Sequence, residues 1–137
     1  MQTEFFMPMI PPTKTHQEKE LTIRNGKPVI YEPAELKAVR MKLRGNLAKW
    51  VPDSKYSGPV RMVTKWCFPL IRGRSNGEYK TTKPDTDNLQ KMLKDEMEHV
   101  GFWDNDAIVA SEITEKFWAK IPGIYICISE LGGDRAI

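Results

Sequence analysis

The segment that most constrains the fold is VRMVTKWCFPL, residues 60–70, whose apolar residues are nearly continuous toward its end. Apolar, β-branched and aromatic residues in such a run are typical of a strand that lies inside a sheet. We therefore expect residues 60–70 to form a central strand.

Four further segments have the composition of strands. Residues 3–10 are rich in aromatic side chains and are followed by two prolines, which stop a strand. Residues 21–31 have two β-prone arms around an Asn-Gly pair, a strong signal for a hairpin. Two later strand-like runs cover residues 107–118 and 123–131.

Two segments have the pattern of helices. One covers residues 33–50, and its apolar residues recur at helical spacing, at Leu36, Val39, Leu43 and Leu47. Its other face is basic and is expected to be solvated, with Lys37, Arg40, Lys42, Arg44 and Lys49. The second helix is expected over residues 88–99.

These elements predict an α+β fold in a single small domain over residues 1–131, followed by a frayed tail at residues 132–137. A chain of 137 residues with 40% apolar and 28% charged residues suits one hydrophobic core. The net charge of +3 permits a nucleic-acid partner but does not require one.

The cysteines and the N-terminus indicate a cytoplasmic protein. Cys67 and Cys127 lie far apart in apolar runs, so we expect reduced core residues. The chain has only two histidines besides these cysteines, His16 and His99, and the four residues do not have the spacing of a zinc site. The N-terminus lacks the basic start of a signal peptide, and no apolar run approaches the roughly 20 residues of a membrane helix.

Residues 71–84 form a long basic segment with glycines and prolines, which predicts a loop. Two interpretations of the loop stay open. In one, its cations are solvated. In the other, they contact DNA backbone phosphates, through Arg72, Arg74, Lys80 and Lys83.

Two acids stand just before the second helix. Pro84 and the following turn are expected to keep Asp85 and Asp87 extended until Asn88. Asp87 could cap the helix, with Gln90 completing a capping box. That role does not account for Asp85, which would lie outside the helix.

Lys91 follows Asp87 by four residues and shares its helix face. One interpretation is a surface ion pair worth about 0.3–0.5 kcal/mol. The other is an ammonium that faces the same place as the two carboxylates and binds a phosphate.

A third acid, Asp106, can return to this place. A helix of roughly 12 residues carries the chain about 18 Å away, and residues 100–106 can span at most about 25 Å when extended. Carboxylates at Asp85, Asp87 and Asp106 would make an oxygen site suited to Mg²⁺ or Mn²⁺.

Other uses of these acids fit less well. An EF-hand loop beginning at Asp85 would need a glycine at Gln90 and an oxygen ligand at Leu89. A DxD nucleotide-sugar site would normally come with a larger nucleotide-binding domain, and the chain has no glycine-rich phosphate loop.

Taken together, DTDNLQK at residues 85–91 and GFWDND at residues 101–106 resemble the RusA family of Holliday junction resolvases of phages and prophages. The family's signature is D-x-D-N-L-x-K, then one helix, then G-x-[WY]-x-D-D and a strand. The sequence IPPT at residues 10–13 also resembles the end of the family's first strand. The resemblance spans residues 5–131 and is strongest over residues 83–109.

The resemblance implies a RusA-like mixed β-sheet with two main helices packed on it. It implies that Asp85, Asp87 and Asp106 bind a catalytic Mg²⁺, for which Mn²⁺ could substitute, and that Lys91 takes part in catalysis or grips the DNA. It further implies a homodimer that nicks branched DNA, namely four-way junctions, at symmetric positions.

This chain departs from the family pattern at two places. Asn105 stands where the family usually has the first Asp of a pair, but the essential acid matches Asp106, so activity is expected to survive. Thr13-Lys14-Thr15 stands where the family often has Asn, which puts junction contacts by that segment in doubt.

Aromatic residues leave a further choice. Phe102 and Trp103 are expected in the core or in a dimer interface rather than stacked on splayed bases. Trp66 and Phe68 are expected in the core, and Tyr79 in the basic loop is the better stacking candidate. The alternatives to a resolvase are a nuclease of other branched or duplex DNA, a DNA-binding module without cleavage, and a structural protein.

Overall fold

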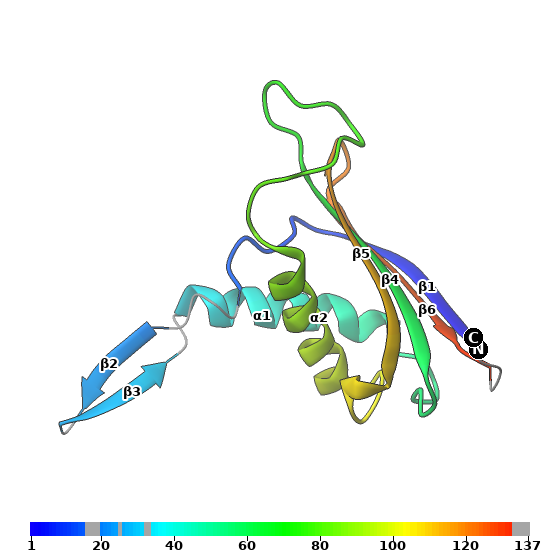
Figure 1. Ribbon diagram of the computed structural model, residues 1–137, viewed down its shortest axis with the longest axis horizontal. Coiled ribbons are helices and arrows are strands. Elements are labelled where there is room, and N and C mark those ends of the chain that lie inside the picture. The colour runs from blue at the N-terminus through cyan, green and yellow to red at the C-terminus, as the bar shows by residue number, and fades with distance from the viewer. Residues whose placement is uncertain (16–19, 25, 32–33, 133–137) are drawn as a thin grey trace.

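A computed structural model describes residues 1–15, 20–24, 26–31 and 34–132 (Figure 1). Its elements are, in chain order, β1 (Gln2–Pro8), β2 (Glu20–Arg24), β3 (Lys27–Tyr31), α1 (Ala34–Leu47), η2 (Ala48–Trp50), β4 (Val60–Pro69), α2 (Thr86–Val100), η3 (Asp106–Ile108), β5 (Val109–Ala119) and β6 (Gly123–Glu130). One sheet has the strand order β1-β6-β4-β5, and β2 and β3 pair separately. The predicted α+β class is therefore confirmed.

β4 is an interior strand of this sheet, as its sequence predicts. It runs antiparallel to β6 and parallel to β5, so the sheet is mixed. Burial alternates along β4, because one face of the sheet is covered and the other is not. Its covered side chains form the centre of the core, and they are Val60, Met62, Thr64, Trp66 and Phe68.

Both cysteines lie on the less covered face of the sheet. Cys67 alternates with Trp66 and Phe68, and both Cys67 and Cys127 are half-buried free thiols. The expectation that they are core residues is therefore wrong, because strand alternation turns them away from the helices.

Both long helices cover one face of the sheet (Figure 1). In α1 the predicted apolar stripe is confirmed, because Leu36, Leu43 and Leu47 are buried and Val39 packs against them. Neither helix has the length and the hydropathy that crossing a lipid bilayer requires, within the part of the chain that the structure describes.

The basic face of α1 is only partly solvated, which corrects the prediction. Arg40 and Arg44 each bind the buried carboxylate of Glu96 in α2, with N–O distances of 3.0 and 2.7 Å. Glu96 is 1% exposed. These two arginines therefore hold α1 against α2, whereas Lys37, Lys42 and Lys49 are exposed.

The predicted hairpin is confirmed as β2 and β3, which lie apart from the four-stranded sheet at the start of α1 (Figure 1). Asn25 at its turn lies outside the described residues, as do residues 133–137 of the predicted tail.

Candidate active site

The start of α2 presents the first two acids. The helix begins at Thr86, and Asp85 is its N-cap residue, with φ −75° and ψ 149°. The backbone carbonyl of Asp85 accepts a hydrogen bond from the N–H of Leu89 at 3.1 Å. Asp87 lies inside the first turn, where its Oδ1 accepts from the N–H of Asn88 at 3.0 Å.

The prediction that Asp87 caps the helix is therefore wrong by two residues. Proline restricts the residue that precedes it, which is Lys83, and leaves Asp85 free to begin the helix. Gln90 does not complete a capping box, because its side chain is buried and hydrogen-bonds to Trp66 and Thr64.

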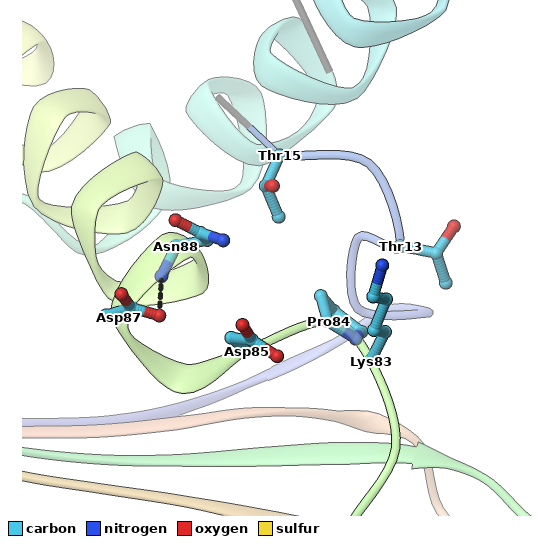
Figure 2. Close-up of a pocket in the computed structure, with 7 residues that line it drawn as sticks. All are labelled: Thr13, Thr15, Lys83, Pro84, Asp85, Asp87 and Asn88. Atoms are coloured by element: carbon cyan, nitrogen blue, oxygen red, sulfur yellow. Dashed lines mark hydrogen bonds between the residues drawn. The ribbon is translucent and has the colours of Figure 1, made fainter. Parts of the chain in front are cut away.

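Asp85 and Asp87 line one cavity of about 420 Å³, which we call the Asp85 cavity (Figure 2). Its remaining lining residues are Thr13, Thr15, Lys83, Pro84 and Asn88. Figure 2 shows this hollow between the start of α2 and the segment that follows β1. The sequence gives no local signal that Thr13 and Thr15 line a cavity with Asp85, because they approach it only through the tertiary fold.

A second cavity of about 390 Å³, the Asp106 cavity, lies on the other side of Asp87. Its lining residues are Asp87, Gln90, Lys91, Lys94, Asp106 and Glu112. The chain therefore returns after α2 as expected, and Asp106 shares a cavity with Asp87 and Lys91.

Two hydrogen bonds fix the backbone at Asp106. Its N–H donates to Oε1 of Glu98 in α2 at 2.8 Å. The side chain of Asn105 accepts from the N–H of Ala107 at 2.8 Å and so caps η3. Asn105, the departure from the family pattern, thus has a structural role in the turn that presents Asp106.

The two cavities group the three acids in pairs. Asp87 lines both cavities, whereas Asp85 and Asp106 each line one. Among the residues described, no three acidic, histidine or cysteine side chains are grouped closely enough to hold a metal ion. The expectation that Asp85, Asp87 and Asp106 hold one metal ion together therefore stays a prediction.

Lys94 and Glu112 are polar residues of the Asp106 cavity that sequence reasoning missed. Their side chains form an ion pair at 3.0 Å between α2 and β5, and both are partly exposed. A signal was present, because Lys94 follows Lys91 by three residues and so lies on the same helix face.

The basic loop is not uniformly solvated. Its last residues lie along the end of β5, where the N–H of Lys80 donates to the carbonyl of Lys116 at 2.9 Å. Arg72 is exposed, Arg74 pairs with Glu78 at 2.8 Å, and Lys83 reaches the Asp85 cavity.

Lys80 departs from the prediction of a phosphate contact. It is only 8% exposed, and its ammonium donates to the carbonyl of Lys83 and to the hydroxyl of Thr82, both at 2.5 Å. Burial, and after it the nearby charges of Lys116 and Arg74, lower the pKa of Lys80. The ammonium is therefore directed at the backbone of its own loop rather than at solvent.

The aromatic residues are placed as follows. Phe102 and Trp103 are fully buried, so the expectation of a core position is confirmed. Tyr79 is 61% exposed and stacks on Phe117 with ring centroids 4.8 Å apart. Phe117 pairs with Cys67 and so lies on the face of the sheet away from the helices. Tyr79 therefore stacks on the face of the sheet opposite the helices, and it lines neither cavity.

Comparison with known proteins identifies the family to which the chain belongs. The model of endodeoxyribonuclease RusA matches residues 9–129. This chain belongs to the RusA endodeoxyribonuclease family. A relative in Bacillus subtilis (strain 168), described as uncharacterized protein YqaN, is 30% identical over 121 residues, which cover 80% of this chain and 84% of the relative. The RusA match begins just after β1 and ends within β6, and it includes the lining residues of both cavities. The acids therefore belong to the part of the chain that the family shares.

Proposed function

We propose that this RusA-family chain is a Mg²⁺-dependent endonuclease that resolves four-way DNA junctions by paired symmetric nicks. The observation that carries the proposal is the Asp106 cavity, where Asp87, Lys91 and Asp106 lie together in a chain of an endodeoxyribonuclease family. Two carboxylates beside an ammonium are suited to phosphodiester hydrolysis.

The residues present fit a magnesium ion. Mg²⁺ prefers oxygen ligands, keeps several waters, and is usually held by one or two carboxylates together with substrate phosphates. Asp87 and Asp106 across one cavity meet that need, and Asp85 in the neighbouring cavity is the third ligand we propose. When bound, Mg²⁺ or Mn²⁺ would lower the pKa of a water and stabilise charge on the scissile phosphate.

The chain's own side chains then have separate tasks. Lys91 is exposed at the Asp106 cavity and would neutralise a non-bridging phosphate oxygen. Water adds to phosphorus as the bond to the 3′ oxygen breaks, which leaves a 5′-phosphate and a 3′-hydroxyl.

Backbone phosphates outside the cavity would be met by the exposed cations of the loop. Lys83 lines the Asp85 cavity and Arg72 is exposed, so both are available, and Arg74 would have to leave Glu78. Such contacts position DNA without reading its sequence.

A homodimer follows from the proposed task. A four-way junction must be cut in two strands, and one small domain has one such pair of cavities. Free thiols at Cys67 and Cys127 agree with action in the reducing cytoplasm.

The test uses a plasmid that extrudes a cruciform, together with a matched plasmid that does not, in Mg²⁺ and in EDTA. Paired nicks convert the cruciform plasmid to linear DNA, and only with metal. Cutting of both plasmids would instead indicate a general duplex nuclease, and tight junction binding without cutting would indicate a module that lacks cleavage.

The dimer is tested in the same assay by mixing wild-type protein with an excess of Asp106→Asn protein. Mixed dimers would nick one strand, so nicked circles should replace linear product. An unchanged ratio of linear to nicked product would contradict a dimer that cuts with both protomers.

A further inference from the structure

Lys116 lies on the face of β5 that the helices cover. It pairs in register with the buried Trp66 of β4, and residues paired across strands share a face. Its ammonium donates to the backbone carbonyls of Thr82 and Pro84, both at 2.7 Å. Lys116 therefore bridges the edge strand of the sheet to the segment that leads into Asp85.

Lys80 binds the same segment from the loop itself. Its ammonium donates to the carbonyls of Thr82 and Lys83, at 3.3 and 2.5 Å. It lies 4.7 Å from the ring centroid of Trp118 and 5.1 Å from that of Phe68. The three consecutive carbonyls of residues 82–84 thus all accept from lysine ammonium groups, and Thr82 accepts from both.

These partners are unusual for two lysines. Neither lysine takes part in an ion pair with a carboxylate within the described ranges of the chain. Hydrogen bonds from a charged donor are roughly twice as strong as neutral ones. Two neighbouring ammonium groups therefore bind the backbone carbonyls of one short segment, residues 82–84.

The consequence falls on Asp85. The carbonyl of Pro84 and the N–H of Asp85 belong to one planar peptide group, so the bond from Lys116 orients that plane. The next peptide plane is oriented by the carbonyl of Asp85, which accepts from Leu89 in α2. With both flanking planes oriented, the direction of the Cα–Cβ bond of Asp85 is set as well, and with it the region that the carboxylate can reach.

We infer that Lys116 is a positioning residue for Asp85, that Lys80 supports it, and that neither contacts DNA. The inference deepens the proposed function, because it rests on Asp85 acting in the cleavage reaction. Lys116 of β5 thus acts on the position of the Asp85 carboxylate through the backbone of residues 82–84.

The test compares Lys116→Met, Lys116→Arg and the control Lys120→Met, since Lys120 is an exposed lysine just beyond β5. Lys116→Met should lower the single-turnover cleavage rate at saturating junction by about 10- to 100-fold, the usual cost of losing a supporting residue. Junction affinity in EDTA should stay within about twofold, because no phosphate contact is lost. Lys116→Arg retains charged donors and should recover part of the rate, and Lys120→Met should match the wild type.

A second measurement does not depend on activity. Backbone ¹⁵N order parameters at Thr82 and Asp85 should fall from about 0.85 toward 0.6 in Lys116→Met and stay high in Lys120→Met. Unchanged order parameters would overturn the inference, and so would a loss of junction affinity that equals the loss of rate. If the wild type cuts no junction, the proposed function fails, and the order parameters still decide whether Lys116 positions Asp85.

Discussion

The two cavities that share Asp87 are built in different ways. The Asp106 cavity lies between regular elements, with lining residues from α2, η3 and β5 and an ion pair between Lys94 and Glu112 across it. The Asp85 cavity is formed mostly by irregular chain, residues 13–15 and 83–85, beside the first turn of α2. In the first, side chains pair with one another. In the second, lysines bind the backbone that presents the acid.

This difference indicates how precision is obtained in each place. Helices and strands hold side chains by packing and by their own hydrogen bonds, so a site on them needs little further support. A loop must be held by added contacts, and here charged donors supply them. Substitutions of the proposed metal ligands should therefore affect chemistry directly, and substitutions of the loop residues around the Asp85 cavity should act mainly through geometry or DNA binding.

The largest effect is expected for Asp106→Asn. Loss of its charge removes a proposed metal ligand, and junction cleavage in Mg²⁺ should fall by about 10³-fold or more. Junction affinity in EDTA should be unchanged or slightly tighter, because a negative charge has been removed from the DNA-facing surface. Asp104→Asn is the matched control, since Asp104 is exposed and pairs with Lys55. Near-normal cleavage by Asp106→Asn would show that the Asp106 carboxylate takes no part in the reaction.

A smaller effect is expected for the pair across that cavity. Glu112→Gln should lower the single-turnover rate by about tenfold, because Lys94 loses the partner that holds it. Lys94→Met should have a similar effect, and the double variant should be little worse than either alone. Fully multiplicative losses in this cycle would show that the two residues act independently.

Lys83 tests whether the Asp85 cavity binds DNA phosphates. Lys83→Met should weaken junction binding and reduce the slope of log affinity against log salt by about one, as expected for a lost phosphate contact. The cleavage rate at saturating DNA should change little. Lys49→Met, at an exposed lysine of η2, is the control. An unchanged salt slope would show that Lys83 makes no phosphate contact.

The smallest effect on activity is expected for Glu96→Gln, which lies outside both cavities. It removes the buried charge that Arg40 and Arg44 bind, and should lower the free energy of unfolding by about 2–3 kcal/mol. Cleavage per folded molecule should be close to normal. Urea unfolding measures the loss, with Glu35→Gln at the start of α1 as control. A stability equal to the wild type would mean that the arginines do not hold the two helices together.

The sequence predicts the regular elements well, because alternation along β4 and the helical spacing of Leu36, Leu43 and Leu47 are local signals. It misses the partner of Arg40 and Arg44, since a basic helix face looks the same whether it meets solvent or a distant acid such as Glu96. The helix start is displaced because Asp85 and Asp87 are both good N-cap residues, and the choice depends on where the chain leaves the loop.

The candidate site is predictable only in part. The D-x-D spacing and Lys91 are local, and the reach of the chain after α2 brings Asp106 near Asp87 as expected. The division into two cavities is tertiary, as is the contribution of Thr15 from beyond β1. The burial of Lys80 is tertiary too, because nothing in a basic loop marks which lysine turns inward over Phe68 and Trp118.

The central claim is that both cavities serve one reaction centre through Asp87. A double-mutant cycle with Asp85→Glu and Asp106→Glu tests it most directly. Each change misplaces a carboxylate without removing it, which should cost about 10- to 100-fold in single-turnover junction cleavage and keep the rates measurable. Residues that act as a unit are strongly non-additive. We therefore predict that the double variant is little slower than the slower single variant, whereas a loss equal to the product of the two single losses would contradict a shared centre.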